Sequence, residues 1–205
     1  LLMKRVYDVA GTSPERIHVF LNGKEIKVKN FSEYIDLYLK GKFFDSENQV
    51  EFAKVMCDGK ERWDVAFSLT DGAFQHVSFV NGICTSKGGT HVNYIVDQVT
   101  DRVSDFIKKK NKDIKLNTNQ IKQNLWVFIN CFIENPSFNS QTKEFLTTKV
   151  ENFGSSFTIT EKFFKEFLKS DIVNNIIEYG KAKQKVKLSK ALSSNSPSPK
   201  YGVDG

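Results

Sequence analysis

The sequence predicts an α+β domain in which helices pack on a mixed sheet and one long helix leads out of the body. Two observations support this prediction. Segments that alternate apolar and polar residues, typical of strands, concentrate between residues 17 and 80, whereas later segments repeat their apolar residues at helical spacing. The longest apolar run, residues 125–133, is much shorter than the roughly 18 residues of a membrane span, so we expect no membrane segment.

A β-hairpin and a short helix are expected first. Residues 17–21 and 25–28 are β-prone, and Asn22-Gly23 between them tolerates the positive φ angles of a tight turn. From Phe31 to Leu39 the apolar spacing changes to three and four, which predicts a helix that ends at Gly41.

Three strands are expected next, in residues 50–56, 63–70 and 74–80. Each alternates apolar and polar side chains, and the turn pairs Asp58-Gly59 and Asp71-Gly72 separate them. Consecutive strands joined by short turns commonly pair, so we expect an antiparallel meander.

The clearest predicted helix follows Gly88-Gly89. Thr90 is a candidate N-cap, and apolar residues recur at helical spacing from Val92 to Ile107. The helix is expected to end at Lys108–Lys110, where positive charge suits the carbonyl end of the helix dipole.

The C-terminal half is expected to contain one central strand and two helices. Residues 125–133 are almost continuously apolar, which indicates a strand in the middle of the sheet that is covered on both faces. Thr160 and Ser170 each precede an apolar helical repeat. Residues 193–205 are rich in serine and proline, so we expect a linker there.

Positive charge is local in this chain. The net charge is +6, yet residues 181–205 hold six lysines and one aspartate, and residues 108–115 hold five lysines and one aspartate. The remainder is therefore net negative. Only four of the 30 basic residues are arginines, so non-specific attraction to phosphates is favoured over base recognition.

Neither self-contained catalysis nor a metal site is indicated. The three cysteines are odd in number and widely spaced, which argues against a disulfide framework and favours a reducing compartment. His18, His76 and His91 have no partners at metal-ligand spacing, and the sequence contains no nucleophile elbow or P-loop. We therefore expect structural roles for the histidines, no metal ligand, and no complete enzyme in this chain alone.

The segment PSFNSQTKE, residues 136–144, is the strongest candidate site. It follows the predicted central strand, so a rigid element delivers its polar tip to a fixed place. Lys143 offers an ammonium group, Gln141 an amide and Thr142 a hydroxyl, a set of donors that suits a phosphate. The alternative is a solvated polar turn before a helix.

Several motifs of the chain resemble the transducer domain of eukaryotic type II DNA topoisomerases, over residues 1 to about 190. The most specific is the pairing of SFVN…TSKGGTH with NPSFNSQTKE later in the chain, which contains a Gln-Thr-Lys loop. The motifs occur in the family's order: LLMKRVYDVAG, HVFLNGKEI, FSEYIDLYLK, SFVNGICTSKGGTHVNY, KKKNK and WVFINCFIENPSFNSQTKE. The chain begins with Leu1 and not with methionine, so we expect a fragment boundary at this end.

The resemblance implies a fold and a division of the chain. The expected fold is ribosomal-protein-like: a mixed, mainly antiparallel sheet with helices on one side, a left-handed crossover and a long C-terminal helix. Residues 1–16 are the expected junction with an N-terminal ATPase domain that this sequence lacks. Residues 17–180 are the expected transducer domain, and residues 181–205 a basic helix end and a Ser/Pro-rich linker. Residues 87–91 are expected to pack at a strand-to-helix junction.

The resemblance also implies a function, the ATP-dependent change of DNA topology by an isomerase. ATP with Mg²⁺ is bound mainly by the ATPase domain, and the loop contacts the γ-phosphate. The expected contacts are Gln141 and Lys143, with Thr142 beside them in the loop. ATP binding and hydrolysis are relayed to the DNA gate, which opens for strand passage. No catalytic residue is expected in this chain.

The implied partners are the protein's own ATPase domain and DNA-cleavage core, duplex DNA, and a second copy in a nuclear homodimer. Lys108, Lys109, Lys110 and Lys112 resemble the family's basic loop that faces DNA, although they also suit a solvated helix end. The alternative function is a non-catalytic basic module that binds nucleic acid without a nucleotide switch.

Overall fold

The computed structural model describes residues 2–40, 54–57, 62–70, 72–111 and 113–194. The helices are α1 (Leu2–Thr12), α2 (Phe31–Leu39), α3 (Thr90–Lys110), α4 (Thr118–Lys122), α5 (Glu161–Lys169) and α6 (Asp171–Ser194), with a 3-10 turn η1 (Val150–Asn152). The strands are β1 (Phe20–Leu21), β2 (Lys24–Glu25), β3 (Val55–Cys57), β4 (Trp63–Leu69), β5 (Gln75–Val80), β6 (Ile83–Cys84), β7 (Gly88–Gly89), β8 (Leu125–Cys131) and β9 (Phe145–Leu146).

The main sheet has five strands in the order β3-β4-β8-β5-β6. Strand β8 pairs antiparallel with β4 and parallel with β5, and the other two pairings are antiparallel. The mixed, mainly antiparallel sheet and the central position of β8 are therefore confirmed. The expected meander is right for the antiparallel pair of β3 and β4 and wrong beyond it, because β8 lies between β4 and β5. The most apolar strand takes this place because only a central strand is covered on both faces.

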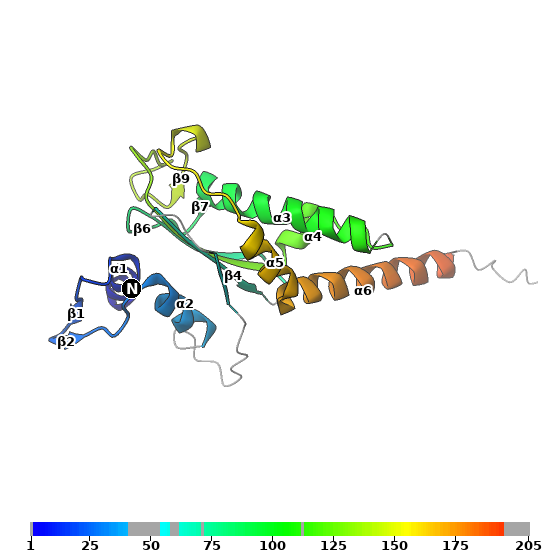
Figure 1. The fold of residues 1–205 in the computed structure, drawn as a ribbon, viewed down its shortest axis with the longest axis horizontal. Helices are drawn as coiled ribbons and strands as arrows, with labels where there is room; N and C mark the ends of the chain where they lie inside the picture. Colours follow the sequence, from blue (N-terminus) through cyan, green and yellow to red (C-terminus); the bar gives the residue numbers. More distant parts are fainter. Residues whose placement is uncertain (1, 41–53, 58–61, 71, 112, 195–205) are drawn as a thin grey trace, which may run out of the picture.

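Helices cover both faces of the sheet. On one face α3, α5 and α6 pack against a core that includes Val65, Phe67, Val127 and Ile129. On the other face the aromatic side chains of α2 pack against Phe128, Phe79 and Ala66. Figure 1 shows α3 and α2 on opposite sides of the strands. The expectation of helices on one side is thus corrected: β8 alternates apolar residues toward both faces, and each face requires a cover.

The helix starts show which caps the sequence predicts correctly. Thr160 caps α5, where its hydroxyl accepts a hydrogen bond from Phe163 N. Thr90 does not cap α3. It is the first residue of the helix, the cap position is Gly89, and the Thr90 hydroxyl donates to the Thr148 carbonyl oxygen at 2.6 Å. Because Thr90 lies inside the helix and not at the cap position, its hydroxyl does not cap α3 and instead contacts the segment that contains Thr148.

The predicted hairpin is present but shorter than expected. Strands β1 and β2 pair antiparallel around Asn22 and Gly23, whose φ angles of 50° and 76° are both positive. This is the turn that the Asn-Gly pair predicts. Helix α2 also begins and ends close to the expected residues, and the Asn30 side chain caps it by accepting from Glu33 N.

Helix α1, within the expected junction, packs on α2 through a buried polar contact. Asp8 is buried and accepts hydrogen bonds from the Lys4 ammonium at 2.9 Å and from the Tyr34 hydroxyl at 2.6 Å. The Tyr34 hydroxyl also lies 2.9 Å from that of Tyr38. The two helices are close, since a Cβ at Gly11 would lie 2.5 Å from Tyr34 Cγ.

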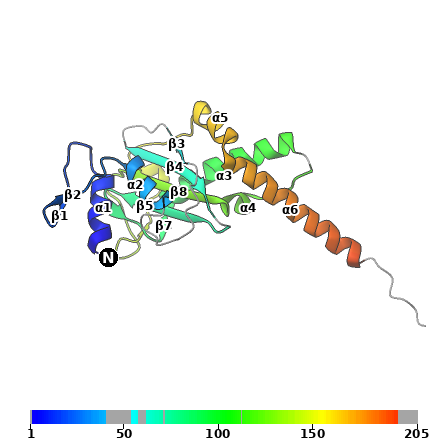
Figure 2. The same cartoon turned by 90° about the horizontal axis from the view of Figure 1, so that it is seen from below.

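The predicted long helix is α6, which projects from the body in Figures 1 and 2. Its first turns are buried through Ile172, Val173 and Ile176. Further along, a Cβ at Gly180 would lie 2.6 Å from Cγ2 of Ile114, so glycine permits the segment after α3 to rest on α6. The expected linker in residues 193–205 begins too early, because Ser193 and Ser194 still belong to α6, and its remaining residues lie outside the described residues.

The parallel connection from β5 to β8 runs through α3 and α4. The left-handed sense expected for this crossover stays a prediction. Within the part of the chain that the structure describes, no helix combines the length and the apolar character that crossing a bilayer requires.

Candidate functional site

The loop of residues 136–144 is built as a hairpin that two neighbouring segments support. At its start, Asn81 exchanges two hydrogen bonds of 2.9 Å with the backbone of Ile133. At its base, Phe138 forms an antiparallel bridge with Leu146. The next element is the strand β9 and not a helix, which corrects that part of the alternative, while the exposed polar turn that the alternative describes is present. The loop projects from a closed base.

The tip of the loop carries the predicted site residues Gln141, Thr142 and Lys143, and all three are exposed. The Lys143 backbone N–H donates to the Ser140 carbonyl oxygen at 3.1 Å, which closes a turn. Lys143 has a φ of 57°, a left-handed conformation that is uncommon for residues other than glycine. Such backbone strain persists where the surrounding structure fixes it, and it concentrates at functional sites.

The side chains of the tip divide into two groups. The Thr142 hydroxyl lies 2.9 Å from that of Ser140 and donates to Glu144 at 3.2 Å, so it holds the turn together. The Lys143 ammonium lies 6.0 Å from the centre of the Phe138 ring and stays at the surface. Lys143 and Gln141 are thus the side chains that the loop presents outward.

The base of the loop is attached to the strand-to-helix junction that precedes α3. Strand β7 pairs in parallel with β9, and the Lys87 N–H donates to the Glu144 carbonyl oxygen at 2.9 Å. A Cβ at Gly89 would lie 2.6 Å from Leu146 N and closer still to Leu146 O. Only glycine allows this approach. The packing role expected for residues 87–91 therefore agrees with the structure. Their packing partner, strand β9, lies too far along the sequence for a local pattern to reveal it.

Two of the three histidines lie together in the interior. The Thr85 hydroxyl lies 3.1 Å from His91 Nε2 and 2.7 Å from the Ser78 hydroxyl, which is 3.3 Å from His76 Nδ1. Burial, with a smaller contribution from the nearby His76, lowers the pKa of His91 to about 3. His91 is thus a neutral, buried group, in line with the structural role expected for it. Among the described residues, no three His, Cys, Asp or Glu side chains are grouped to hold a metal ion.

The predicted basic loop lies at the other end of α3. Lys108, Lys109 and Lys110 form the exposed last turn of the helix, and Lys108 pairs with Asp105 at 3.5 Å. Lys112 lies outside the described residues. Helix α3 has 21 residues and is therefore about 30 Å long. Since β7 and β9 lie at its start, the lysines and the Gln141–Lys143 tip are two separate sites (Figure 1).

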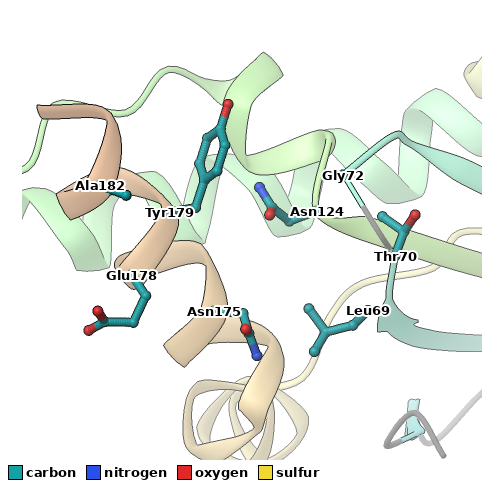
Figure 3. A pocket seen from close by; sticks show the side chains of 8 residues that line it. All are labelled: Leu69, Thr70, Gly72, Asn124, Asn175, Glu178, Tyr179 and Ala182. Atoms are coloured by element: carbon teal, nitrogen blue, oxygen red, sulfur yellow. The ribbon is translucent and has the colours of Figure 1, made fainter. Parts of the chain in front are cut away.

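A cavity of about 490 Å³ lies where β4 ends beside α6 (Figure 3). It is lined by Leu69, Thr70, Gly72, Asn124, Asn175, Glu178, Tyr179 and Ala182. The Asn124 and Asn175 side-chain amides already donate, each at 2.8 Å, to backbone carbonyl oxygens. None of these residues belongs to the loop of residues 136–144, so the cavity is not part of the phosphate-binding candidate.

The family of this chain follows from its match to a sequence profile. The profile of the DNA gyrase B family matches residues 30–195. The chain belongs to the DNA gyrase B family. Within this family it is similar to eukaryotic enzymes: it is 42% identical to DNA topoisomerase 2-alpha of Sus scrofa over 94% of the chain, and 42% identical to DNA topoisomerase 2 of Arabidopsis thaliana over 93%. The chain spans only 12% and 13% of the length of these relatives.

Solved structures of related proteins have the same fold as this chain. The ATPase region of Saccharomyces cerevisiae topoisomerase II matches 86% of the chain, and 43% of that structure is covered, with a TM-score of 0.75 and 42% identity. The ATPase and transducer domains of DNA topoisomerase II from Balamuthia mandrillaris match 90% of the chain, with 44% of that structure covered, a TM-score of 0.80 and 34% identity. The resemblance to type II topoisomerases and the α+β fold class are thereby confirmed.

Proposed function

We propose that this chain is the transducer part of an ATP-dependent type II DNA topoisomerase, and that its Gln-Thr-Lys loop senses the γ-phosphate of ATP. The observation that carries this proposal is the exposed, strained tip at Lys143, held on a closed base in a chain whose relatives include topoisomerase ATPase regions. Rigid support with an outward-facing cation is what recognition of a neighbouring domain's ligand requires.

The chemistry of the proposed contact follows from the side chains. The γ-phosphate of ATP is an anion, to which the Lys143 ammonium and the Gln141 amide can donate hydrogen bonds. Thr142 is engaged inside the loop, so we assign it to the shape of the turn. The ATPase domain would hold most of the ATP and its Mg²⁺, while this chain contributes the two outer contacts.

The proposed relay depends on differential contact between nucleotide states. With ATP bound, the γ-phosphate ties the loop to the ATPase domain and fixes one arrangement of the two domains. Hydrolysis and phosphate release remove the tie, so the equilibrium between arrangements shifts. Helix α6 would carry the movement toward the DNA-cleavage core, and the DNA gate would open for strand passage. In this proposal residues 1–16 are the ATPase junction, residues 17–180 the transducer and residues 181–205 the outgoing connection.

The remaining partners are proposed on the same grounds. Lys108, Lys109 and Lys110 form an exposed cationic site that suits duplex DNA held in the core, and Lys112, which follows them in the sequence, is proposed for the same role. The relatives are eukaryotic topoisomerases, which supports a nuclear homodimer as the working state.

The test is Lys143→Ala in the full-length topoisomerase that carries this chain. We expect ATP-dependent strand passage to fall about ten- to hundredfold, the equivalent of one charged hydrogen bond, with ATP-independent DNA cleavage unchanged. Lys149→Ala is the matched control, because Lys149 is another exposed lysine close in sequence, 3.8 Å from Glu151. Equal strand passage by Lys143→Ala and Lys149→Ala would refute the proposal and favour a nucleic-acid module that acts through the lysines of α3.

A further inference from the structure

The ion pair between Lys87 and Glu144 joins the two segments that carry the loop. The Lys87 ammonium lies 2.7 Å from the Glu144 carboxylate, which also accepts from Ser86 and Thr142 at 3.2 Å each. The Lys87 side chain is 65% exposed and that of Glu144 36%. Exposed ion pairs contribute little to stability because water screens them, so stability does not explain this arrangement.

The backbone holds the loop independently of this ion pair. Gly88 pairs with Phe145 and Gly89 with Leu146, and the Lys87 N–H donates to the Glu144 carbonyl oxygen. Replacing the Lys87 side chain leaves all of these backbone contacts in place. The side-chain pair is therefore free to serve a purpose other than attachment.

The charges beside the tip indicate an electrostatic role for the ion pair of Lys87 and Glu144. Glu144 directly follows Lys143, and its carboxylate accepts a hydrogen bond from the Thr142 hydroxyl at 3.2 Å, so its negative charge lies at the tip that an anion would approach. With Lys87 present, the three side chains carry a net charge of +1, and without it they carry none. The Glu144 carboxylate is ionised at neutral pH, and the hydrogen bond from Lys87 lowers its pKa below the ordinary value. Its negative charge therefore offsets that of Lys143 unless Lys87 balances it.

We propose that Lys87 is a positioning residue of the phosphate sensor: it neutralises Glu144 and so leaves the charge of Lys143 available to the γ-phosphate. This inference rests on the proposed function. The residue acts through Glu144 and touches no phosphate itself. Its contribution is electrostatic, and therefore it depends on Glu144 being charged.

The test compares Lys87→Ala, Glu144→Gln and the double variant in the full-length topoisomerase, with strand passage measured against ATP concentration. Lys87→Ala should raise the ATP concentration for half-maximal rate about fivefold, the scale of a unit-charge interaction that water screens, and leave the saturated rate almost unchanged. Glu144→Gln should not raise it. The double variant should return to within about twofold of the parent, and Lys87→Arg should match the parent.

The outcomes separate the inference from its premise. If the ion pair is only a mechanical clasp, Glu144→Gln is as damaging as Lys87→Ala and the double variant shows no recovery, which overturns the inference. An unchanged ATP dependence of Lys87→Ala, in an assay where Lys143→Ala is impaired, also overturns it. If Lys143→Ala is itself unimpaired, the proposed function fails first. Because Lys87 is exposed, all variants should retain the parent's melting temperature, and this checks that they fold.

Discussion

Replacing Gly89 by alanine should destabilise the fold far more than the loss of one glycine usually does. The φ of Gly89 is 142°, a conformation that costs a residue with a Cβ about 1–3 kcal/mol. The added Cβ would also lie 2.6 Å from Leu146 N and 2.8 Å from Leu146 Cβ, an overpacked contact that costs about 1–3 kcal/mol. The neighbouring atoms belong mostly to backbone, so they cannot turn aside. We expect the free energy of unfolding to fall by about 3–5 kcal/mol.

Urea unfolding followed by tryptophan fluorescence measures this loss, because Trp63 is buried in the main core beside Phe153 and Phe157. Gly23→Ala is the matched control. Gly23 also has a positive φ, of 76°, but a Cβ there would meet nothing within 4 Å. The control should lose only about 1 kcal/mol, the conformational part alone. If Gly89→Ala and Gly23→Ala lose the same amount, then the close approach of β7 to β9 is not what requires glycine.

Two further predictions concern buried polar groups. Tyr34→Phe removes a hydrogen bond to the buried Asp8 carboxylate and should lower the unfolding free energy by about 1.5–3 kcal/mol in urea denaturation; a loss below about 0.5 kcal/mol would contradict the role of this contact. His91 should make the fold sensitive to acid. Its pKa is about 3 in the fold and 6.5 as the ordinary value, so only the unfolded chain takes up the proton as the pH falls below 6.5. The contribution of neutral His91 to the free energy of unfolding is therefore fully present above pH 6.5. Between pH 6.5 and pH 3 it falls by about 1.4 kcal/mol per pH unit, which is a loss of about 2 kcal/mol at pH 5. His91→Asn should flatten the difference in stability between pH 7 and pH 5, and an unchanged pH dependence in this variant would assign it to other groups.

Sequence patterns predicted the types of most elements but not all of their neighbours. The apolar run of β8 identified the central strand, because only burial on two faces explains it. The pairing of β8 between β4 and β5 escaped prediction, since alternation shows which face a residue occupies and not which strand lies beside it. Helix α1 was missed for a different reason: its buried residues are Asp8, Ala10, Gly11 and Thr12, which form no apolar stripe.

In the candidate site, too, the sequence predicts the exposed residues but not their long-range contacts. Residue types alone placed Gln141 and Lys143 in an exposed loop after a strand, and the structure agrees. The contact of Lys87 with Glu144 joins residues 57 positions apart, and no local pattern signals it. The positive φ of Lys143 was equally hidden, because the closed base of the hairpin imposes this conformation and the residue type does not favour it.

In the proposed relay, the packing of Gly180 against Ile114 limits how far α6 can tilt. The helix has 24 residues, about 36 Å, but its first part is fixed in the core and Gly180 is held by the segment after α3. The contact with residues 113–120 is the fulcrum. It extends along α6 to Leu188, because Lys183, Gln184 and Leu188 line a hollow with that segment, so the arm beyond it is residues 189–194, about 9 Å. A tilt of about 10° there displaces the far end by about 2 Å, compared with about 6 Å for an arm of the full length. This packing makes α6 stiffer and reduces the movement of its far end. Because Ile114 lies just after α3, the same contact also connects α6 to the end of α3 that carries the lysines.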